Sequence, residues 1–433
     1  MADASNEFAP VTVGEDQLQP WYQVVAVPAL LGFSLIIFIT GLDIYKASSM
    51  QTTLLAILIG STIIFAIGTA MGMIGARTRM SSYLLVRIAF GDLGASIVNL
   101  AFAVSLIGWF GVQINVFNEG VLYLSNDMFE STPSVLVLSI VASILMTATC
   151  LLGFKAISWL SLALSPIMVL ATAYMIYAIL TTAPVGEMMT RETAETLSLR
   201  SGVSAIVGTI IVGAIILPDI TRFVRKWTGV FNVVFIAYFV IQILVLATGA
   251  FGGAATNAGP DTDILDVMLT LGLGLGAFGI VIAGAWVLNA LNLYGAVLSI
   301  KATFPKLNQL ILTIALGAIG VIAALLNILD YFITFLIYLS VIFTPVAGVI
   351  MADYVLLNQK AYTLETLSNN SGINMTGFAA WALGGLYAGL CTGGVMTPLS
   401  GLVEIDAILI SAISYYLVTR LVRGREGAHA DRN

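Results

Sequence analysis

LLGFSLI, residues 30–36, puts a glycine and a serine in the middle of an apolar run near the start of the chain. A comparable run, VGTIIVGAI at residues 207–215, lies five apolar segments later. Interrupted helices at corresponding positions of two inverted repeats are typical of transporters, where they mark a binding site near the middle of the membrane. The alternative is that these glycines allow close helix packing, as small residues do in membranes. Taken alone the two stretches leave both possibilities open, and their positions favour interrupted helices.

The composition indicates an integral membrane protein. Of 433 residues, 59% are hydrophobic and 9% are charged, whereas a soluble globular protein has about 25% charged residues. Apolar runs of eighteen or more residues recur and match helices that cross roughly 30 Å of hydrocarbon. We predict twelve helices, at residues 24–44, 54–75, 94–124, 135–153, 157–181, 203–223, 231–250, 267–300, 307–327, 331–356, 376–394 and 404–421. The third and eighth are too long for an upright crossing, so we expect them to be tilted or to extend beyond the bilayer.

The helix count suggests two repeats of five helices followed by two peripheral helices. A repeat with an odd number of helices inverts in the membrane, so two sets of five helices, one starting inside and one outside, are expected. The predicted divisions are an N-terminal tail at 1–23, a core at 24–356 with repeats 24–181 and 203–356, peripheral helices at 357–423 and a C-terminal tail at 424–433.

The positive charges predict the orientation. An N-terminus in the cytoplasm leaves only Lys46, Arg191 and Arg200 outside and puts the other 14 of the 17 Lys and Arg residues inside. Cytoplasmic loops carry such an excess of Lys and Arg. The acidic opening tail is followed by a full-length span, so no cleaved signal peptide is indicated. We therefore expect a multi-pass protein of the inner (plasma) membrane with both termini in the cytoplasm, surrounded by lipid as a monomer.

Several classes of function lack their sequence signatures. Cys150 and Cys391 lie in apolar helices and read as small buried side chains. The single histidine, His429, lies in the C-terminal tail, and we assign it neither a metal nor a catalytic role. No Cys/His cluster, Walker A loop or nucleophile elbow is present, so we predict no enzyme and no cofactor. The acidic pI and dispersed basic residues argue against a nucleic-acid partner.

SLIGWFGVQINVF, residues 105–117, carries polar and aromatic side chains where a plain membrane anchor has leucine. At about 100° per residue, Ser105, Trp109 and Gln113 share one stripe of a helix, which we expect to face the bundle interior. An indole offers a flat π surface, and a glutamine one turn away offers a paired donor and acceptor. Together they suit a planar ligand with amide-like edges. The alternative is a packing tryptophan and a glutamine that hydrogen-bonds a neighbouring helix.

Five stretches resemble the nucleobase:cation symporter-1 family and occur in the same order. They are residues 74–91, which are similar to the loop between helices 2 and 3 of that family, and the motifs IGWFGVQ, LPDITRFVR, WVLNALNLYG and TPVAGVIMADYVL. The resemblance runs from about residue 20 to residue 420. It implies a leucine-transporter-like fold, five plus five helices with two extra, that binds a planar heterocycle between helices 1, 3, 6 and 8.

The resemblance also implies roles for single residues. Trp109 corresponds to the tryptophan on which the ligand stacks, and Gln113 to a glutamine that hydantoin permeases use. Asn289 corresponds to a helix 8 asparagine that cytosine permeases use. Thr209 and Ile210 stand where cytosine permeases have a serine and a phenylalanine, so one side of their aromatic sandwich is aliphatic here. Two further polar positions of that pocket are apolar, Leu106 and Val212, which argues against cytosine itself.

The family's sodium site is also altered. Sodium users supply backbone carbonyls from the broken helix 1, here near Phe33 and Ser34, and hydroxyl groups from helix 8, where this chain has Val287 and Leu288. Sodium is a hard cation that needs oxygen ligands, and apolar side chains cannot replace its hydration shell. The resemblance therefore implies transport without sodium at that site and no bound metal.

A proton is the natural substitute, and it needs an ionisable group. Carboxylates inside a membrane are functional candidates by default. The candidates are Asp43 near the outer end of helix 1, Glu119 in the outer part of helix 3 and Asp219 near the inner end of helix 6. For each there is an alternative: Asp43 has Lys46 one turn on, Glu119 could contact another helix, and Asp219 could join Arg222 and Arg225 in an ion-pair cluster.

The sequence therefore predicts a secondary active transporter that imports a nucleobase or related heterocycle by alternating access, with the proton as the candidate coupling ion. A cation-independent facilitator and a membrane solute sensor are the alternatives. A sensor needs a soluble output domain, whereas the predicted C-terminal tail is about ten residues.

Overall fold

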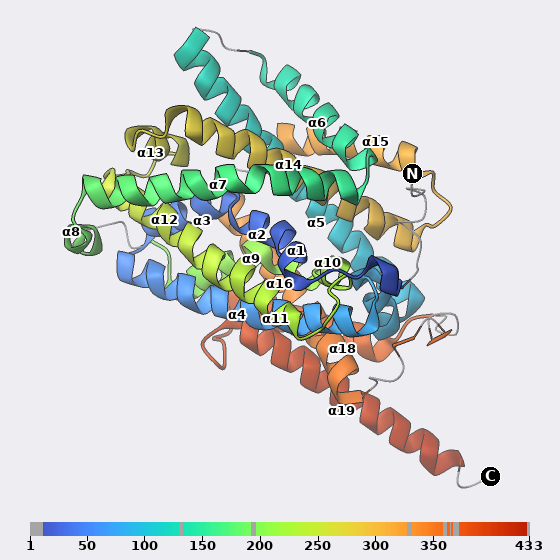
Figure 1. Ribbon diagram of the computed structural model, residues 1–433. Coiled ribbons are helices and arrows are strands. Elements are labelled where there is room, and N and C mark those ends of the chain that lie inside the picture. The colour runs from blue at the N-terminus through green and yellow to red at the C-terminus, as the bar shows by residue number, and fades with distance from the viewer. Residues whose placement is uncertain are drawn as a thin grey trace.

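The computed structural model describes residues 12–129, 133–191, 196–326, 331–357, 362–363, 365–366 and 372–430. Within these ranges the regular structure is helical, apart from one isolated bridge between Gln19 and Val224 (Figure 1). The helices are η2 Glu15–Gln17, α1 Trp21–Val24, α2 Ala26–Gly32, α3 Leu35–Ala47, α4 Met50–Thr78, α5 Ser82–Phe129, α6 Val135–Leu151, α7 Phe154–Thr182, α8 Val185–Thr190, α9 Leu199–Ile215, α10 Pro218–Thr221, α11 Gly229–Val234, η3 Phe235–Ile241, α12 Gln242–Ala255, α13 Ile264–Thr270, α14 Gly274–Thr303, α15 Gln309–Leu325, α16 Phe332–Ala352, η5 Asp353–Leu357, α18 Met375–Thr392 and α19 Val403–Ala430. Each of the twelve predicted segments coincides with one of these helices or with a consecutive run of them. Lys360 and Arg432, two cations used for the orientation, lie outside the described residues.

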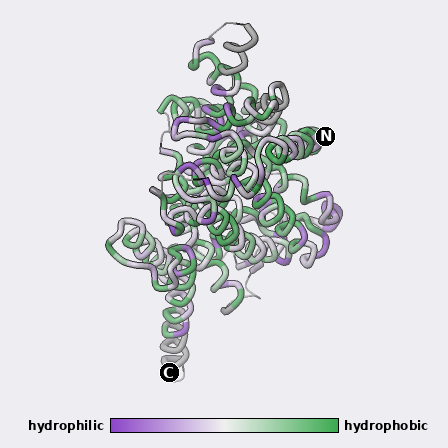
Figure 2. The backbone as a smooth tube through the Cα atoms, turned by 90° about the vertical axis from the view of Figure 1, so that its left-hand side faces the viewer, coloured by the Kyte–Doolittle hydropathy of each residue, from purple (hydrophilic) through white to green (hydrophobic). Residues whose placement is uncertain are grey.

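The surface of the bundle is apolar, as a membrane protein requires. Six helices are long and apolar enough to cross a membrane, and the bent pair Trp21–Gly32 and Leu35–Ala47 makes a seventh, judged by length and composition over the described residues. Large apolar side chains such as Leu170 and Ile144 point outward. Figure 2 shows hydrophobic residues along most of the chain, with hydrophilic positions scattered between them.

The predicted break in the first helix is confirmed. Helix α2 ends at Gly32 and α3 begins at Leu35, and the two axes differ by 44°. Phe33 and Ser34 connect them, and Ser34 has an extended backbone (φ −65°, ψ 150°). Glycine is the poorest helix former after proline, so an interruption here has a low cost.

The second predicted break lies elsewhere. Helix α9 continues through the glycine-containing run 207–215, and the interruption follows it, at Ile216 and Leu217 before α10. Pro218 begins α10, because proline has no amide hydrogen for a continuing helix. Gly208 instead serves close packing: a Cβ placed there would lie 1.8 Å from the carbonyl oxygen of Leu336 on α16. For Gly208 the packing alternative is therefore the correct one.

A glycine precedes the predicted segment 94–124, and another divides the predicted segment 267–300. Gly91, with φ 72°, kinks α5, and the residues before it, expected as part of a loop, form a helix from Ser82. Residues 83–86 there are buried, so this short helix contributes to the core. Gly272, with φ 81°, lies in the turn between α13 and α14. A left-handed residue ends a helix, and glycine adopts that conformation without a steric penalty.

We predict that Gly208→Ala lowers the melting temperature of the purified protein. The added methyl group must displace the α16 backbone, and such overpacking costs about 1–3 kcal/mol. Gly389→Ala on α18 is the matched control, because no atom lies within 4 Å of a Cβ there. Thermal unfolding in detergent measures both variants. Equal melting temperatures for the two would contradict the packing of α9 on α16.

Candidate functional site

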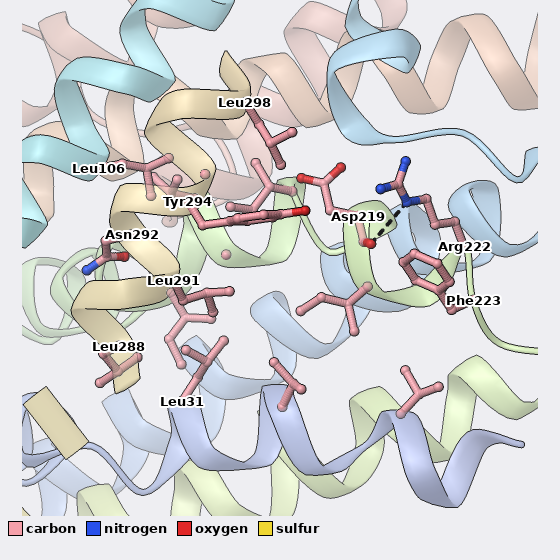
Figure 3. A pocket seen from close by; sticks show the side chains of 18 of the residues that line it. Leu31, Leu106, Asp219, Arg222, Phe223, Leu288, Leu291, Asn292, Tyr294 and Leu298 are labelled. Carbon is pink, nitrogen blue, oxygen red and sulfur yellow. Dashed lines mark hydrogen bonds between the residues drawn. The ribbon is translucent and has the colours of Figure 1, made fainter. Parts of the chain in front are cut away.

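A cavity of about 1290 Å³ opens beside the broken first helix (Figure 3). Its walls come from α2, the break and the start of α3, from α5, from α9 and α10, and from α14, and α7 adds Trp159 and Leu162. In Figure 3 the α14 side chains Leu288, Leu291 and Leu298 stand on one side and Asp219 and Phe223 on the other. The walls include the four helices between which the resemblance placed the ligand, and α7 contributes in addition.

Trp109 lies in the α5 wall of this cavity. Its indole packs edge-on against two rings of α16, with centroid distances of 5.5 Å to Phe335 and 6.1 Å to Phe332. Such edge-to-face pairs fix the ring plane. Ser105, Trp109 and Gln113 are all buried, so the stripe faces the bundle interior as predicted. The residues of α5 that line the cavity are Leu106, Trp109 and Gln113, and Ser105 does not line it.

Thr209 and Ile210 face the cavity from α9. The Thr209 hydroxyl donates to the Ala205 carbonyl at 2.9 Å and lies 3.5 Å from the Thr40 hydroxyl of α3. With Ile210 and Leu288 in the walls, the cavity offers mostly apolar surface around Trp109 and Gln113.

Two of the four predicted sodium-site positions line the cavity and two are buried behind its wall. Ser34 lines the cavity, and its N–H donates to the Leu31 carbonyl at 3.3 Å. Phe33 is buried and does not line it. Leu288 lies in the α14 wall, and Val287 is buried. Neither α14 side chain carries an oxygen toward the break.

Asn289 lies behind the cavity wall rather than in it. It is fully buried, and its amide nitrogen donates to the Phe110 carbonyl at 2.9 Å and contacts Met146 Sδ at 3.2 Å. Asn292, one turn further along α14, does line the cavity, and its amide lies 3.4 Å from Asn289 Oδ1. Asn292 was not among the predicted site residues, although the motif WVLNALNLYG contains both asparagines. A period of 3.6 residues turns Asn292 toward the face of Leu288 and Leu291.

The candidate carboxylates occupy different surroundings. Asp43 pairs with Lys46 at 3.0 Å, and the Lys46 ammonium also donates to the Thr262 carbonyl. Glu119 is exposed on α5, and neither it nor Asp43 lines the cavity.

Asp219 does line the cavity, but its carboxylate caps another helix. It accepts hydrogen bonds from the N–H and the hydroxyl of Ser82 at the first turn of α5, at 2.8 and 3.0 Å. A carboxylate satisfies the free amide groups of a helix start and the positive end of the helix dipole. Arg222 donates to the backbone carbonyl of Asp219 at 3.2 Å, and Arg225 donates to the carbonyl of Leu18. Among the described residues, neither arginine therefore forms the expected ion pair with the Asp219 carboxylate.

The N-terminal segment Thr12–Gln19 covers one end of the cavity, which no sequence motif indicated. Gln19 exchanges backbone hydrogen bonds with the stretch after α10, donating to Phe223 and accepting from Arg225, both at 2.8 Å. The Arg79 guanidinium fixes the same stretch by donating to the carbonyls of residues 222, 224 and 225. Backbone bonds of this kind do not depend on side-chain identity, which is why the sequence carries no signal for them.

Comparisons with known proteins agree with this geometry. Residues 23–417 match the family described as permeases for cytosine/purines, uracil, thiamine and allantoin. The cytosine permease of Escherichia coli O157:H7 is 29% identical over 399 residues, which cover 91% of this chain and 90% of that protein. The resemblance to the nucleobase:cation symporter-1 family is thereby confirmed.

Two solved structures of Mhp1, a transporter of the nucleobase-cation-symport-1 family, share the fold. The inward-facing conformation aligns with a TM-score of 0.81 and 16% identity, covering 96% of this chain and 93% of that one. The closed conformation with bromovinylhydantoin bound aligns with a TM-score of 0.77 and 18% identity, covering 96% and 95%. The chain therefore belongs to the family of permeases for cytosine/purines, uracil, thiamine and allantoin.

Proposed function

We propose that this permease imports a planar nitrogen heterocycle, a nucleobase or a related compound, by alternating access, and that a proton rather than sodium is the coupled ion. The observation that carries the proposal is Trp109 and Gln113 on one wall of a cavity that is otherwise mostly apolar. A ring stacks on the indole, and its amide-like edge meets Gln113. The relatives' names, cytosine permease and a hydantoin-bound Mhp1, support the same class of ligand.

Several polar groups around the cavity contribute hydrogen bonds to recognition of the heterocycle. Gln113 and Asn292 present amides to the cavity, and each offers both a donor and an acceptor. Asn289 holds Asn292 from behind and acts through it. Thr209 and Ser34 add single hydroxyl groups, and Ile210 gives the second face of the ring an aliphatic contact. A buried polar group without a partner is costly, so water fills these positions until the ligand replaces it.

We assign the described conformation to the state open toward the N-terminal segment. The cavity extends from Trp109 to Thr12–Gln19, and the alignment with inward-facing Mhp1 has the higher of the two TM-scores. With both termini in the cytoplasm, as the distribution of Lys and Arg favours, this is the cytoplasmic side of the inner membrane. We propose that the transporting unit is a monomer, because one chain supplies every wall of the cavity.

We predict that Trp109→Ala weakens ligand binding roughly 5- to 150-fold, because stacking of a base on an aromatic ring is worth about 1–3 kcal/mol. Trp109→Phe keeps part of that affinity. A thermal-shift panel with cytosine, uracil, adenine, allantoin, hydantoin and thiamine identifies the ligand, since ligand binding to the folded state raises its stability. Trp381→Ala on α18, remote from the cavity, is the control. Wild-type affinity in Trp109→Ala excludes the indole as the ligand platform.

We predict that Leu291→Cys, in a background with Cys150 and Cys391 replaced by alanine, reacts with a water-soluble maleimide added from the N-terminal side. Leu291 lines the cavity, whereas Val297 on the same helix is fully buried, so Val297→Cys stays unreacted. A bound heterocycle slows the reaction of Leu291→Cys. Labelling of Leu291→Cys only from the opposite side would contradict the assigned conformation.

We predict that replacing sodium with choline leaves uptake into proteoliposomes unchanged, because Val287 and Leu288 supply no oxygen ligand beside the break at Phe33 and Ser34. Collapse of an inward proton gradient reduces the uptake. The converse variant, Val287→Ser with Leu288→Thr, tests whether hydroxyl groups create sodium dependence. Sodium-stimulated uptake by the wild type would refute the sodium-free assignment.

A further inference from the structure

Glu404 is a buried carboxylate outside the cavity, and the proposed ligand contacts do not involve it. Glu404 lies at the start of α19 and is 1% exposed. It does not line the cavity that contains Trp109. Carboxylates inside a membrane protein are rare and costly, so each one implies a function.

The contacts of Glu404 join three helices on one oxygen. Glu404 Oε1 accepts from the Ser204 hydroxyl of α9 and from the Ser340 hydroxyl of α16, the latter at 3.0 Å. Glu404 Oε2 is buried and has no hydrogen-bond partner among the described residues. Thr344 lies beyond Ser340, with 3.5 Å between the two hydroxyl oxygens. In the ionised form of Glu404, hydrogen bonds therefore stabilise the charge on Oε1 but not on Oε2.

The elements packed against Glu404 bring no compensating cation. Helices α16 and α18 contain no charged residue, and Arg200 of α9 is exposed one turn before Ser204. Over the part of the chain that the structure describes, no Lys or Arg nitrogen lies within 4.0 Å of the Glu404 carboxylate.

The other acidic groups near α19 have hydrogen bonds of their own. Asp406 accepts from Tyr387 of α18 and from the N–H of Ser400. At the far end, Asp353 of η5 accepts from Tyr362 and Tyr415. Glu404 thus differs from both in having one oxygen entirely without a donor.

Glu404 also lies beside the contact between α9, which lines the cavity, and α16, which packs behind α9. Gly208, one turn from Ser204 on α9, packs against Leu336, one turn from Ser340 on α16. The next residue of α9, Thr209, faces the cavity. A shift of α9 along α16 therefore changes the distance between Ser204 and Ser340, which are the two donors to Glu404.

We propose that Glu404 is a proton-binding site of this permease, with Ser204 and Ser340 as the residues that position its carboxyl group. The proton comes from water and binds to Oε2, converting the carboxylate to a neutral carboxyl group, and it returns to water when α9 and α16 move. Burying the neutral form costs far less than burying the ion. This proposal rests on the proposed function, in which transport is coupled to protons, and it names the site of that coupling.

The first test uses the proton itself as the probe. Infrared difference spectra of the reconstituted protein, recorded between acidic and alkaline buffer, should contain the C=O band of a protonated carboxyl group that Glu404→Gln lacks. Asp406→Asn is the matched control and keeps the band. Ser204→Ala and Ser340→Ala move the band to higher frequency, because each hydroxyl group donates to the carbonyl oxygen Oε1. An unchanged spectrum in Glu404→Gln overturns the proposal, and the two serine variants keep the test open if that variant does not fold.

The second test separates coupling from transport. In proteoliposomes, Glu404→Gln should exchange radiolabelled heterocycle from the panel above, cytosine or uracil in the first instance, within about twofold of the wild-type rate. It should lose accumulation driven by an inward proton gradient. Undiminished accumulation in Glu404→Gln refutes the assignment. A wild type that binds none of the panel compounds refutes the proposed function instead, and the infrared band then still reports on Glu404.

Discussion

The backbone groups freed by the break between α2 and α3 need hydrogen-bond partners, and a lipid bilayer offers none. Irregular backbone is tolerated at membrane depth only where it is buried in protein or lines a water-filled space. Here Phe33 and Ser34 donate back into the last turn of α2, and Ser34 faces the cavity. The cavity, and the α5, α9 and α14 walls that enclose it, are thus the surroundings that the broken helix requires.

Close glycine contacts hold the second half of the broken helix in place. A Cβ at Gly41 of α3 would lie 2.0 Å from the Leu246 carbonyl of α12, and one at Gly249 of α12 would lie 2.2 Å from the Phe38 carbonyl. Two helices that approach this closely gain van der Waals contact along their backbones, which is the main attraction available within lipid. The fixed position of α3 in turn sets the distance between Thr40 and Thr209. The same type of contact at Gly208 fixes α9 against α16, so glycines determine the positions of two helices that line the cavity.

The sequence predicted what depends on pattern and missed what depends on three-dimensional context. Apolar runs located the helical segments, of which six, or seven with the bent pair, are long and apolar enough to cross a membrane among the described residues. The glycine and serine at 32 and 34 located the first break, because both signals are local. The second break lies at Ile216 and not at Gly208, which serves close packing. A glycine in an apolar run can mark either a break or a close helix contact, and the sequence does not distinguish the two.

The helical period correctly placed Trp109 and Gln113 on the same side of α5, where both line one cavity. Asn289 and Asn292 were not separated, because which of two neighbouring amides faces the cavity depends on the rotation of α14 against α5 and α6. Glu404 went unnoticed because the residues that surround it, Ser204 and Ser340, are 200 and 64 positions away.

The attachment of the N-terminal segment has a mechanical consequence. Gln19 is hydrogen-bonded to the stretch that follows α10, and Val13 donates to the Arg79 carbonyl at the end of α4, so the segment is held near both of its ends. The Arg79 guanidinium also binds the carbonyls of Arg222 and Val224, so the same group of hydrogen bonds ties α10 to α4. A displacement of α10 relative to α4 must therefore break or stretch these bonds.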